Sequence, residues 1–222
     1  MHKLQQHILV ELIRHDDRRY ADLKPGDVEG NLFMYHLRSL MKAGWVTKRA
    51  DGRYELTADG LRYADGLSLT TLAPRAQPRI VTLIVARNAK GEYLLLRRKR
   101  QPMLGMVGFP YGKVHLGESI GQAAARELKE KTGLAAGLVH RGDGYVTTFR
   151  GDEAVSEIFF HLFVASAIHG QLAASSSAGD VFWGTPHHDD PELLPSVLDL
   201  IDLIEPNENK FFFTELTYHL TK

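Results

Sequence analysis

Three glutamates with the spacing of a cation site lie in the segment Gly112–Leu134, GKVHLGESIGQAAARELKEKTGL. Glu127 and Glu130 are three residues apart, so their carboxylates project together if the segment is helical. Glu118 precedes them and can join them from a loop. Carboxylate oxygens are the ligands that Mg²⁺ prefers, and a bound Mg²⁺ can bridge a pyrophosphate. These residues therefore predict a site for a divalent cation and a phosphate-containing ligand.

A helix of about four turns is expected to position these carboxylates. Residues 119–132 contain no proline and are rich in alanine, leucine, lysine and glutamate, which favour helix. Ser119 is suited to the N-cap, and Gly133 is suited to end the helix. The preceding segment Gly108–Gly112 contains two glycines and a proline, which predict a loop.

This segment resembles the Nudix box, G-x5-E-x7-R-E-U-x-E-E-x-G-U, where U is aliphatic. The residues that match it are Gly112, Glu118, Arg126, Glu127, Leu128, Glu130, Gly133 and Leu134, and the preceding Phe109, Pro110 and Lys113 resemble the family's usual lead-in. The resemblance implies a MutT-like Nudix domain, an α/β/α sandwich with a mixed sheet.

The same resemblance implies roles for single residues. Glu118, Glu127 and Glu130 would be ligands of Mg²⁺ or Mn²⁺, and Glu127 and Glu130 would be catalytic. Structural roles are implied for Gly112, Arg126 and Gly133, with Arg126 orienting the neighbouring glutamates. Without the full spacing, charged residues on a helix would be read as an ordinary solvated face.

Two positions depart from the family pattern. Lys131 stands where the family has the second glutamate of a pair that binds the catalytic metal with Glu127. An ammonium group offers no lone pair, repels a metal and can form a salt bridge to Glu127 instead. Weak or absent metal binding is therefore expected. Tyr111 stands where the family commonly has glycine, and its ring should reshape the loop.

Further charged residues are candidates for the rim of this site. Arg97, Arg98 and Lys113 are predicted to bind phosphate, although exposed charge runs are usually only solvated. Family hydrolases often recruit another acidic residue from beyond the box, for which the candidates are Glu153, Glu157 and Asp180. None of these three stands at a defining spacing.

The first 69 residues predict a small helical unit that ends in a hairpin and a helix. The expected elements are a helix through residues 4–13, a short helix at 20–23, a helix at 28–43, strands at 45–48 and 53–56, and a helix that starts after Thr57. Asp51 and Gly52 form the hairpin turn between the two strands. Gly44 ends the third helix.

That order, together with the run Tyr35–Ala64, resembles the winged helix-turn-helix of PadR, MarR and ArsR-like transcriptional regulators. The resemblance implies that Asn31, Tyr35 and Arg38 of the third helix, and Arg49 and Arg53 of the wing, contact double-stranded DNA. Eleven basic and ten acidic residues in this part of the chain provide no strong basic footprint. A dimerisation or protein-docking module is the alternative.

Residues 70–78 contain two prolines and no periodicity, so they are interpreted as a linker. The second domain is then expected at 79–222. The predicted fold class is α+β, with two domains. Runs 80–87 and 93–98 resemble a hairpin, and further strands are expected at 144–149 and 158–165, with a turn at Gly142–Gly144. The apolar run Phe211–Phe213 suggests a docked strand or a dimer contact.

Composition sets the remaining expectations. The 222 residues are 44% hydrophobic, with 27 basic and 27 acidic side chains, so net charge favours neither nucleic acid nor a membrane surface. The chain has no cysteine, which excludes disulfides and thiolate metal sites. The N-terminus is charged throughout and no apolar run approaches membrane-spanning length, so a cytoplasmic protein without a membrane partner is expected.

Two functions are compatible with these residues. In the first, the Nudix-like domain binds a nucleotide-derived ligand of the nucleoside diphosphate-X type and modulates DNA binding by a homodimeric winged helix, with hydrolysis weak or lost because of Lys131. In the second, the chain is an active Mg²⁺-dependent pyrophosphohydrolase of such a compound. The sequence does not identify the ligand or the DNA operator.

Overall fold

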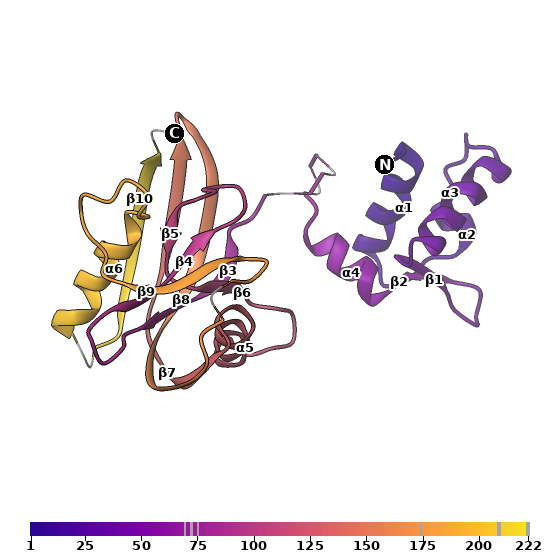
Figure 1. The fold of residues 1–222 in the computed structure, drawn as a ribbon. Coiled ribbons are helices and arrows are strands. Elements are labelled where there is room, and N and C mark those ends of the chain that lie inside the picture. The colour runs from indigo at the N-terminus through magenta and orange to yellow at the C-terminus, as the bar shows by residue number, and fades with distance from the viewer. Residues whose placement is uncertain (69, 72, 75, 174, 208–209, 221–222) are drawn as a thin grey trace. The chain divides into compact units, whose positions relative to one another are not determined.

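The computed structural model describes residues 1–68, 70–71, 73–74, 76–173, 175–207 and 210–220. The chain divides into two compact units, Met1–Ala76 and Gln77–Lys222 (Figure 1). Three residues at the junction, Leu69, Leu72 and Arg75, lie outside the described residues, and two of them belong to the predicted linker.

The first unit has the element order expected from the sequence. Its elements are α1 (Lys3–Arg14), α2 (Tyr20–Leu23), α3 (Gly30–Lys42), β1 (Val46–Lys48), β2 (Tyr54–Leu56) and α4 (Ala58–Asp65). The strands β1 and β2 form an antiparallel hairpin. Apolar side chains of α1 and α3, among them Ile8, Leu12, Phe33 and Leu37, are almost completely buried and form the core of this unit.

The second unit contains two sheets. Its elements are β3 (Arg79–Ala86), β4 (Tyr93–Arg98), β5 (Val107–Gly108), β6 (Tyr111–Lys113), α5 (Ile120–Thr132), β7 (Leu134–Arg150), β8 (Glu153–Gly170), β9 (Gly179–Gly184), α6 (Ser196–Ile204), the 3-10 helix Glu205–Asn207 and β10 (Phe212–Leu220). Five strands form a sheet in the order β10-β7-β8-β3-β6, and three form a smaller sheet in the order β5-β4-β9. The larger sheet is mixed, since β10 is parallel to β7 and β8 is parallel to β3.

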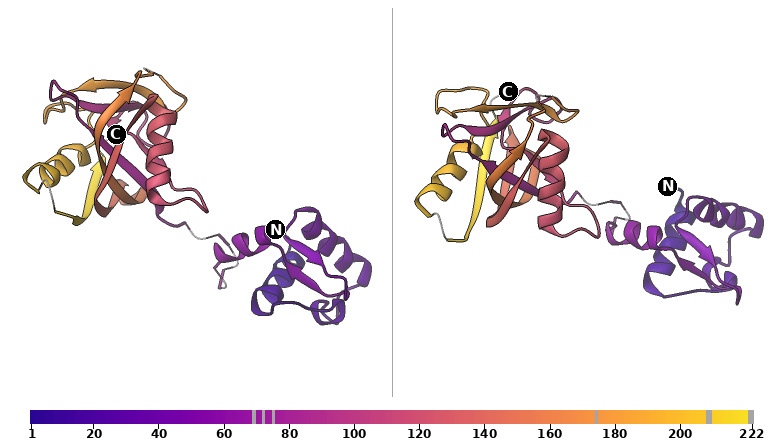
Figure 2. Two further views of the ribbon diagram at one scale, coloured as in Figure 1. Left: turned by 90° about the horizontal axis from the view of Figure 1, so that it is seen from below. Right: turned by 60° about the horizontal axis from the view of Figure 1, so that its bottom comes forward.

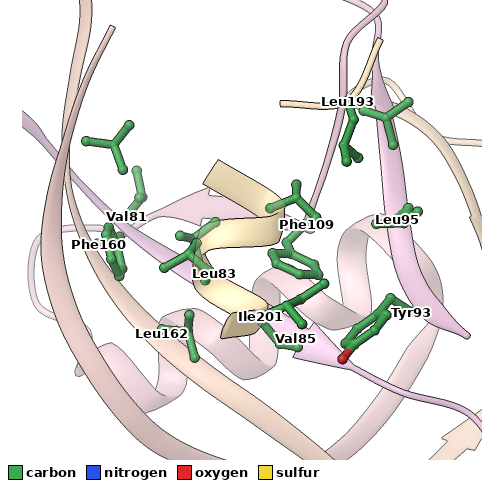
Figure 3. Packing of buried hydrophobic residues seen from close by; sticks show 14 residues of the cluster. Val81, Leu83, Val85, Tyr93, Leu95, Phe109, Phe160, Leu162, Leu193 and Ile201 are labelled. Atoms are coloured by element: carbon green, nitrogen blue, oxygen red, sulfur yellow. The ribbon is translucent and has the colours of Figure 1, made fainter. Parts of the chain in front are cut away.

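Helices α5 and α6 lie on either side of the larger sheet (Figure 2). Successive side chains of a strand point to opposite faces of the sheet, so alternate residues of β3 pack toward α6 on one face and toward α5 on the other. Val81, Leu83 and Val85 pack in the cluster that includes Ile201 of α6, part of which Figure 3 shows. Ile84 packs with α5 in a second cluster. The unit is therefore an α/β/α sandwich with a mixed sheet.

Three predictions of local structure are wrong. The segment Gly108–Gly112 is not all loop, because Gly108 ends β5 and Tyr111 begins β6. Strands β3 and β4 do not form a hairpin; they belong to different sheets and share only the isolated bridge Arg87–Tyr93. Residues 142–144 are not a turn but part of the long strand β7. A Cβ atom on Gly142 would overlap the ring of Phe212, so this glycine allows β10 to approach rather than the chain to turn.

The strand β10 is one of the two structures expected for the apolar tail. It pairs in parallel with β7 over nine residues, and its side chains alternate between half-buried and exposed. Leu216 and Tyr218 pack against the α6 side of the sheet, while Phe213 is 59% exposed. No helix among the described residues is long and apolar enough to cross a membrane.

Candidate functional site

The helix α5 is fixed at both ends by the residues that predict it. The Ser119 hydroxyl accepts a hydrogen bond from the backbone N–H of Gln122, and the Gln122 side chain accepts one from the backbone N–H of Ser119. Gly133 ends the helix at φ 73°, where a Cβ atom would lie 2.6 Å from the carbonyl oxygen of Gln171. The two caps therefore fix where α5 begins and ends, and so which face of the helix carries Glu127 and Glu130.

Glu127 lies directly against the backbone of β6. A Cβ atom on Gly112 would overlap the carboxyl group of Glu127, so only glycine at position 112 leaves room for this side chain. The Glu127 side chain is 8% exposed. The first glycine of the motif is thus explained by close packing with its buried glutamate.

Arg126 connects all three glutamates of the motif. Its guanidinium donates to both oxygens of Glu118, at 2.7 and 3.0 Å, to Oε1 of Glu127 at 2.8 Å and to Oε2 of Glu130 at 3.3 Å. Hydrogen bonding to Arg126 lowers the pKa of Glu118 to about 2, and the carboxylates in turn hold the Arg126 pKa above its usual value. Arg126 contacts the glutamates as the sequence suggested.

Lys131 occupies the other side of Glu127. Its ammonium nitrogen lies 3.0 Å from Oε2 of Glu127 and also donates a hydrogen bond to the carbonyl oxygen of Tyr111. Both oxygens of the Glu127 carboxylate therefore have a cationic partner, Arg126 on one and Lys131 on the other. The Lys131 side chain is only 15% exposed, so this pair is far less screened than a surface ion pair.

The ring of Tyr111 makes cation–π contacts with two side chains. The Lys131 ammonium and the Arg98 guanidinium each lie 4.7 Å from the centre of its ring, and Arg98 donates to its hydroxyl at 2.6 Å. Burial raises the pKa of the Tyr111 phenol, but Arg98, Arg100 and Lys131 outweigh it, so the pKa lies below its usual value. The sequence predicted a reshaped loop here but not these contacts, because they join residues distant in the chain.

The arrangement does not fit a resident Mg²⁺. Three carboxylates face two cations, and the Glu127 oxygens that would bind a metal are already paired. Glu118, Glu127 and Glu130 also do not each bring one carboxylate oxygen to within 4.8 Å of the other two, as a metal site would require; the only group of the described residues that does so lies elsewhere. A metal would have to displace Lys131 to reach Glu127.

The residues predicted to bind phosphate lie apart. Arg97 pairs with Glu192 at 2.6 Å, whereas Arg98 is 9% exposed and turns toward Tyr111. Consecutive strand residues point to opposite faces, so these two side chains cannot form one patch. Lys113 is exposed on β6. Lys113 follows Gly112 on β6, and its carbonyl oxygen accepts a hydrogen bond from Arg126 at 3.0 Å, whereas Arg98 reaches Lys131 only through the ring of Tyr111.

None of the three additional acidic candidates contacts the glutamates of α5 through a described interaction. Asp180 pairs with Lys99 at 2.6 Å, and Glu153 and Glu157 are exposed on β8.

A cavity next to Tyr111 lies on the α6 side of the larger sheet. It is lined by Arg98, Tyr111, Arg79, Ser156, Tyr218 and apolar residues of α6, among others, and has a volume of about 60 Å³. That volume is well below the roughly 300 Å³ or more of a typical small-molecule pocket. A nucleotide-sized ligand would therefore have to widen it.

The residues predicted to contact DNA fall into two groups. Asn31, Tyr35 and Arg38 are exposed on α3, and Tyr35 is 68% exposed. Arg49 and Arg53 instead pair with one carboxylate, that of Asp17, at 2.9 and 2.6 Å. The sequence did not indicate this partner, which partly neutralises the predicted wing.

Comparison with known proteins matches residues 77–195 to the family described as NUDIX domain. The segment is 32% identical to an ADP-ribose pyrophosphatase of Methanocaldococcus jannaschii, over 38% of this chain and 49% of that protein. It is 33% identical to an oxidized purine nucleoside triphosphate hydrolase of Danio rerio, over 44% of this chain and 60% of that protein. The chain thus spans about half the length of these relatives.

A solved structure shows the same fold. The MutT protein of Bacillus halodurans superposes with a TM-score of 0.52 at 22% identity, and the match covers 64% of this chain and 90% of that one.

Proposed function

Because the chain belongs to the Nudix domain family, we propose that its second unit binds a nucleotide-derived ligand of the nucleoside diphosphate-X type as a sensor. Hydrolysis is weak or lost, and the bound ligand modulates DNA binding by the first unit, which acts as a winged helix. Both curated relatives are named for action on nucleotide compounds, which supports the ligand class. Because the chain spans only about half the length of these relatives, the ligand, the sensing role and the DNA binding are all proposed and are not inferred from their names.

The contact between Lys131 and Glu127 carries this proposal. Nudix hydrolases generally use divalent metals such as Mg²⁺, and here an ammonium group occupies the oxygen of Glu127 that a metal would need. A cation fixed in the protein can still attract a ligand phosphate, but it cannot polarise water as a metal does. Binding without rapid turnover follows from this substitution.

The proposal for the first unit is supported by the exposed face of α3. Asn31, Tyr35 and Arg38 lie on one side of that helix, and the hairpin β1–β2 follows it as a wing would. A homodimer is proposed because a winged helix commonly reads a two-fold site. A docking module for protein is the alternative reading of this face.

The alternative function is an active Mg²⁺-dependent pyrophosphohydrolase on a nucleoside diphosphate-X substrate. One observation favours it: the motif keeps all three of these carboxylates, those of Glu118, Glu127 and Glu130, and each accepts a hydrogen bond from Arg126. Such an enzyme would need Lys131 to leave Glu127 before the carboxylates could hold metal.

A turnover assay run beside thermal-shift binding separates these functions. The full chain is incubated with ADP-ribose, other nucleoside diphosphate sugars and nucleoside triphosphates in Mg²⁺ and in Mn²⁺. A Glu127→Gln variant prepared in parallel controls for contaminating phosphatases. Stabilisation by one compound that stays intact supports the sensor. Turnover at ordinary enzyme rates, absent from Glu127→Gln, refutes it and supports the hydrolase.

A further inference from the structure

Two histidines and an aspartate converge on the larger sheet, away from the glutamates of α5. Nε2 of His140 and Nδ1 of His161 each lie 2.7 Å from the same oxygen of Asp143, Oδ1. One ligand atom from each residue lies within 4.8 Å of the other two. His140 and Asp143 come from β7 and His161 from β8, so two paired strands hold the cluster.

Strand register places this cluster relative to Glu127. Glu127 packs against Gly112 of β6, and Gly112 pairs with Thr82 of β3. Thr82 pairs in turn with His161 of β8, and His161 pairs with Asp143 of β7. Paired residues point to the same face, so the cluster lies on the α5 side of the sheet. Two strand spacings separate Gly112 from His161, roughly 10 Å. The cluster is therefore a separate site that shares no ligand with the Nudix motif.

Aromatic side chains surround the two imidazoles. The ring of His140 stacks on Phe163, with centroids 5.0 Å apart, and contacts the edge of Phe211. The ring of His161 contacts Phe159 edge to face. The three side chains are 14 to 28% exposed. The aromatic contacts restrain the orientations of both imidazole rings, and the partial exposure of the three side chains lets a small ion reach them.

We propose that His140, Asp143 and His161 bind a divalent first-row transition ion such as Zn²⁺. Two imidazoles and one carboxylate are a ligand set for such ions and leave coordination positions open. Donors around a tetrahedral Zn²⁺ lie roughly 3 to 3.5 Å apart, so small side-chain rotations would admit the ion. Mg²⁺ prefers oxygen ligands and is selected against by the two imidazole nitrogens.

The proposal predicts which nitrogens carry the metal. His140 would bind through Nε2 and His161 through Nδ1, since these atoms face Asp143. Zn²⁺ added to the ¹⁵N-labelled full chain should therefore shift Nε2 of one histidine and Nδ1 of another. Excess Mg²⁺ is present throughout to occupy sites made only of oxygen ligands. This readout needs no variant and no activity.

Calorimetry with Zn²⁺ and visible absorption with Co²⁺ test the ligands singly. Asp143→Asn and His161→Gln should each weaken Zn²⁺ affinity at least tenfold and remove the Co²⁺ absorption of the wild type. His169→Gln is the matched control, because this histidine is exposed on the same strand β8.

Three results would overturn the proposal: saturating Zn²⁺ that shifts neither nitrogen, unchanged affinity in Asp143→Asn, or an equal loss in His169→Gln. The trio would then be a hydrogen-bonded cluster without metal. Because neither test measures turnover or uses a nucleotide, its failure leaves the proposed Nudix function untouched.

Discussion

At the scale of single residues, the contact between Lys131 and Glu127 sets the chemistry available to the second unit. Lys131→Glu removes the cation and restores a carboxylate one helical turn from Glu127. We expect Mn²⁺ affinity to rise about tenfold or more, equivalent to about 1.4 kcal/mol. Without metal the variant should be less stable, because like charges then face each other.

Isothermal titration with Mn²⁺ and thermal unfolding with and without metal measure both effects. Lys129→Glu is the control, since it makes the same charge change on α5 while Lys129 donates to the carbonyl oxygen of Gly133 at 2.9 Å, away from Glu127. Equal affinities in the two variants would mean that Lys131 does not block the metal.

Gly112 provides a second test at this scale. Gly112→Ala places a methyl group where the Glu127 carboxyl lies, so we expect a loss of about 1–3 kcal/mol in the free energy of unfolding. Gly121→Ala adds the same methyl group to α5, where it would meet no atom within 4 Å beyond its own stretch of the helix, and should stabilise by up to about 1 kcal/mol. Urea unfolding of both variants measures the difference, and equal stabilities would contradict the close packing described above.

At the scale of elements, β10 forms the edge of the larger sheet and packs Leu216 against the buried apolar residues between this sheet and α6. Leu216→Ala should lower the free energy of unfolding by about 1–2 kcal/mol, less than for a fully buried leucine. Thr217→Ala, at the next and exposed position of the same strand, should stay within about 0.5 kcal/mol of the wild type. Equal losses in denaturant unfolding would indicate that β10 does not pack as an alternating strand.

At the scale of the whole molecule, the proposed function includes DNA binding by the first unit. If Arg38 contacts a phosphate, Arg38→Ala should weaken DNA binding about fivefold and reduce the slope of log affinity against log salt by about 0.9. Arg62→Ala removes one positive charge from α4 of the same unit, where Arg62 pairs with Asp59. Fluorescence anisotropy across a salt series distinguishes the two, and no binding by the wild type would favour protein docking instead.

The sequence predicted what depends on residues close together in the chain. The helix expected at 119–132 is observed as Ile120–Thr132, and the expected pairing of Lys131 with Glu127 spans one helical turn. The wrong predictions concern pairing between distant strands. Whether β4 joins β3 or β9 depends on side chains separated by more than eighty residues, and no local pattern encodes that choice.

Some side-chain clusters were missed for the same reason. His140 and His161 are 21 positions apart and meet because β7 and β8 pair in a particular register. A histidine within an apolar strand gives no sign of its partner until that register is known. The pairing of Arg49 and Arg53 with Asp17 likewise required the fold of the first unit.

The Lys131 ammonium on Glu127 also has a genetic consequence. Lysine and glutamate codons differ by a single base at the first position, so one transition separates the present centre from one with the full set of carboxylates. The contacts of Lys131 with Tyr111 oppose that step, because glutamate would lose the carbonyl bond and the favourable position over the ring. Populations selected for hydrolysis should therefore change codons 131 and 111 together, because the side chains at these positions stabilise each other.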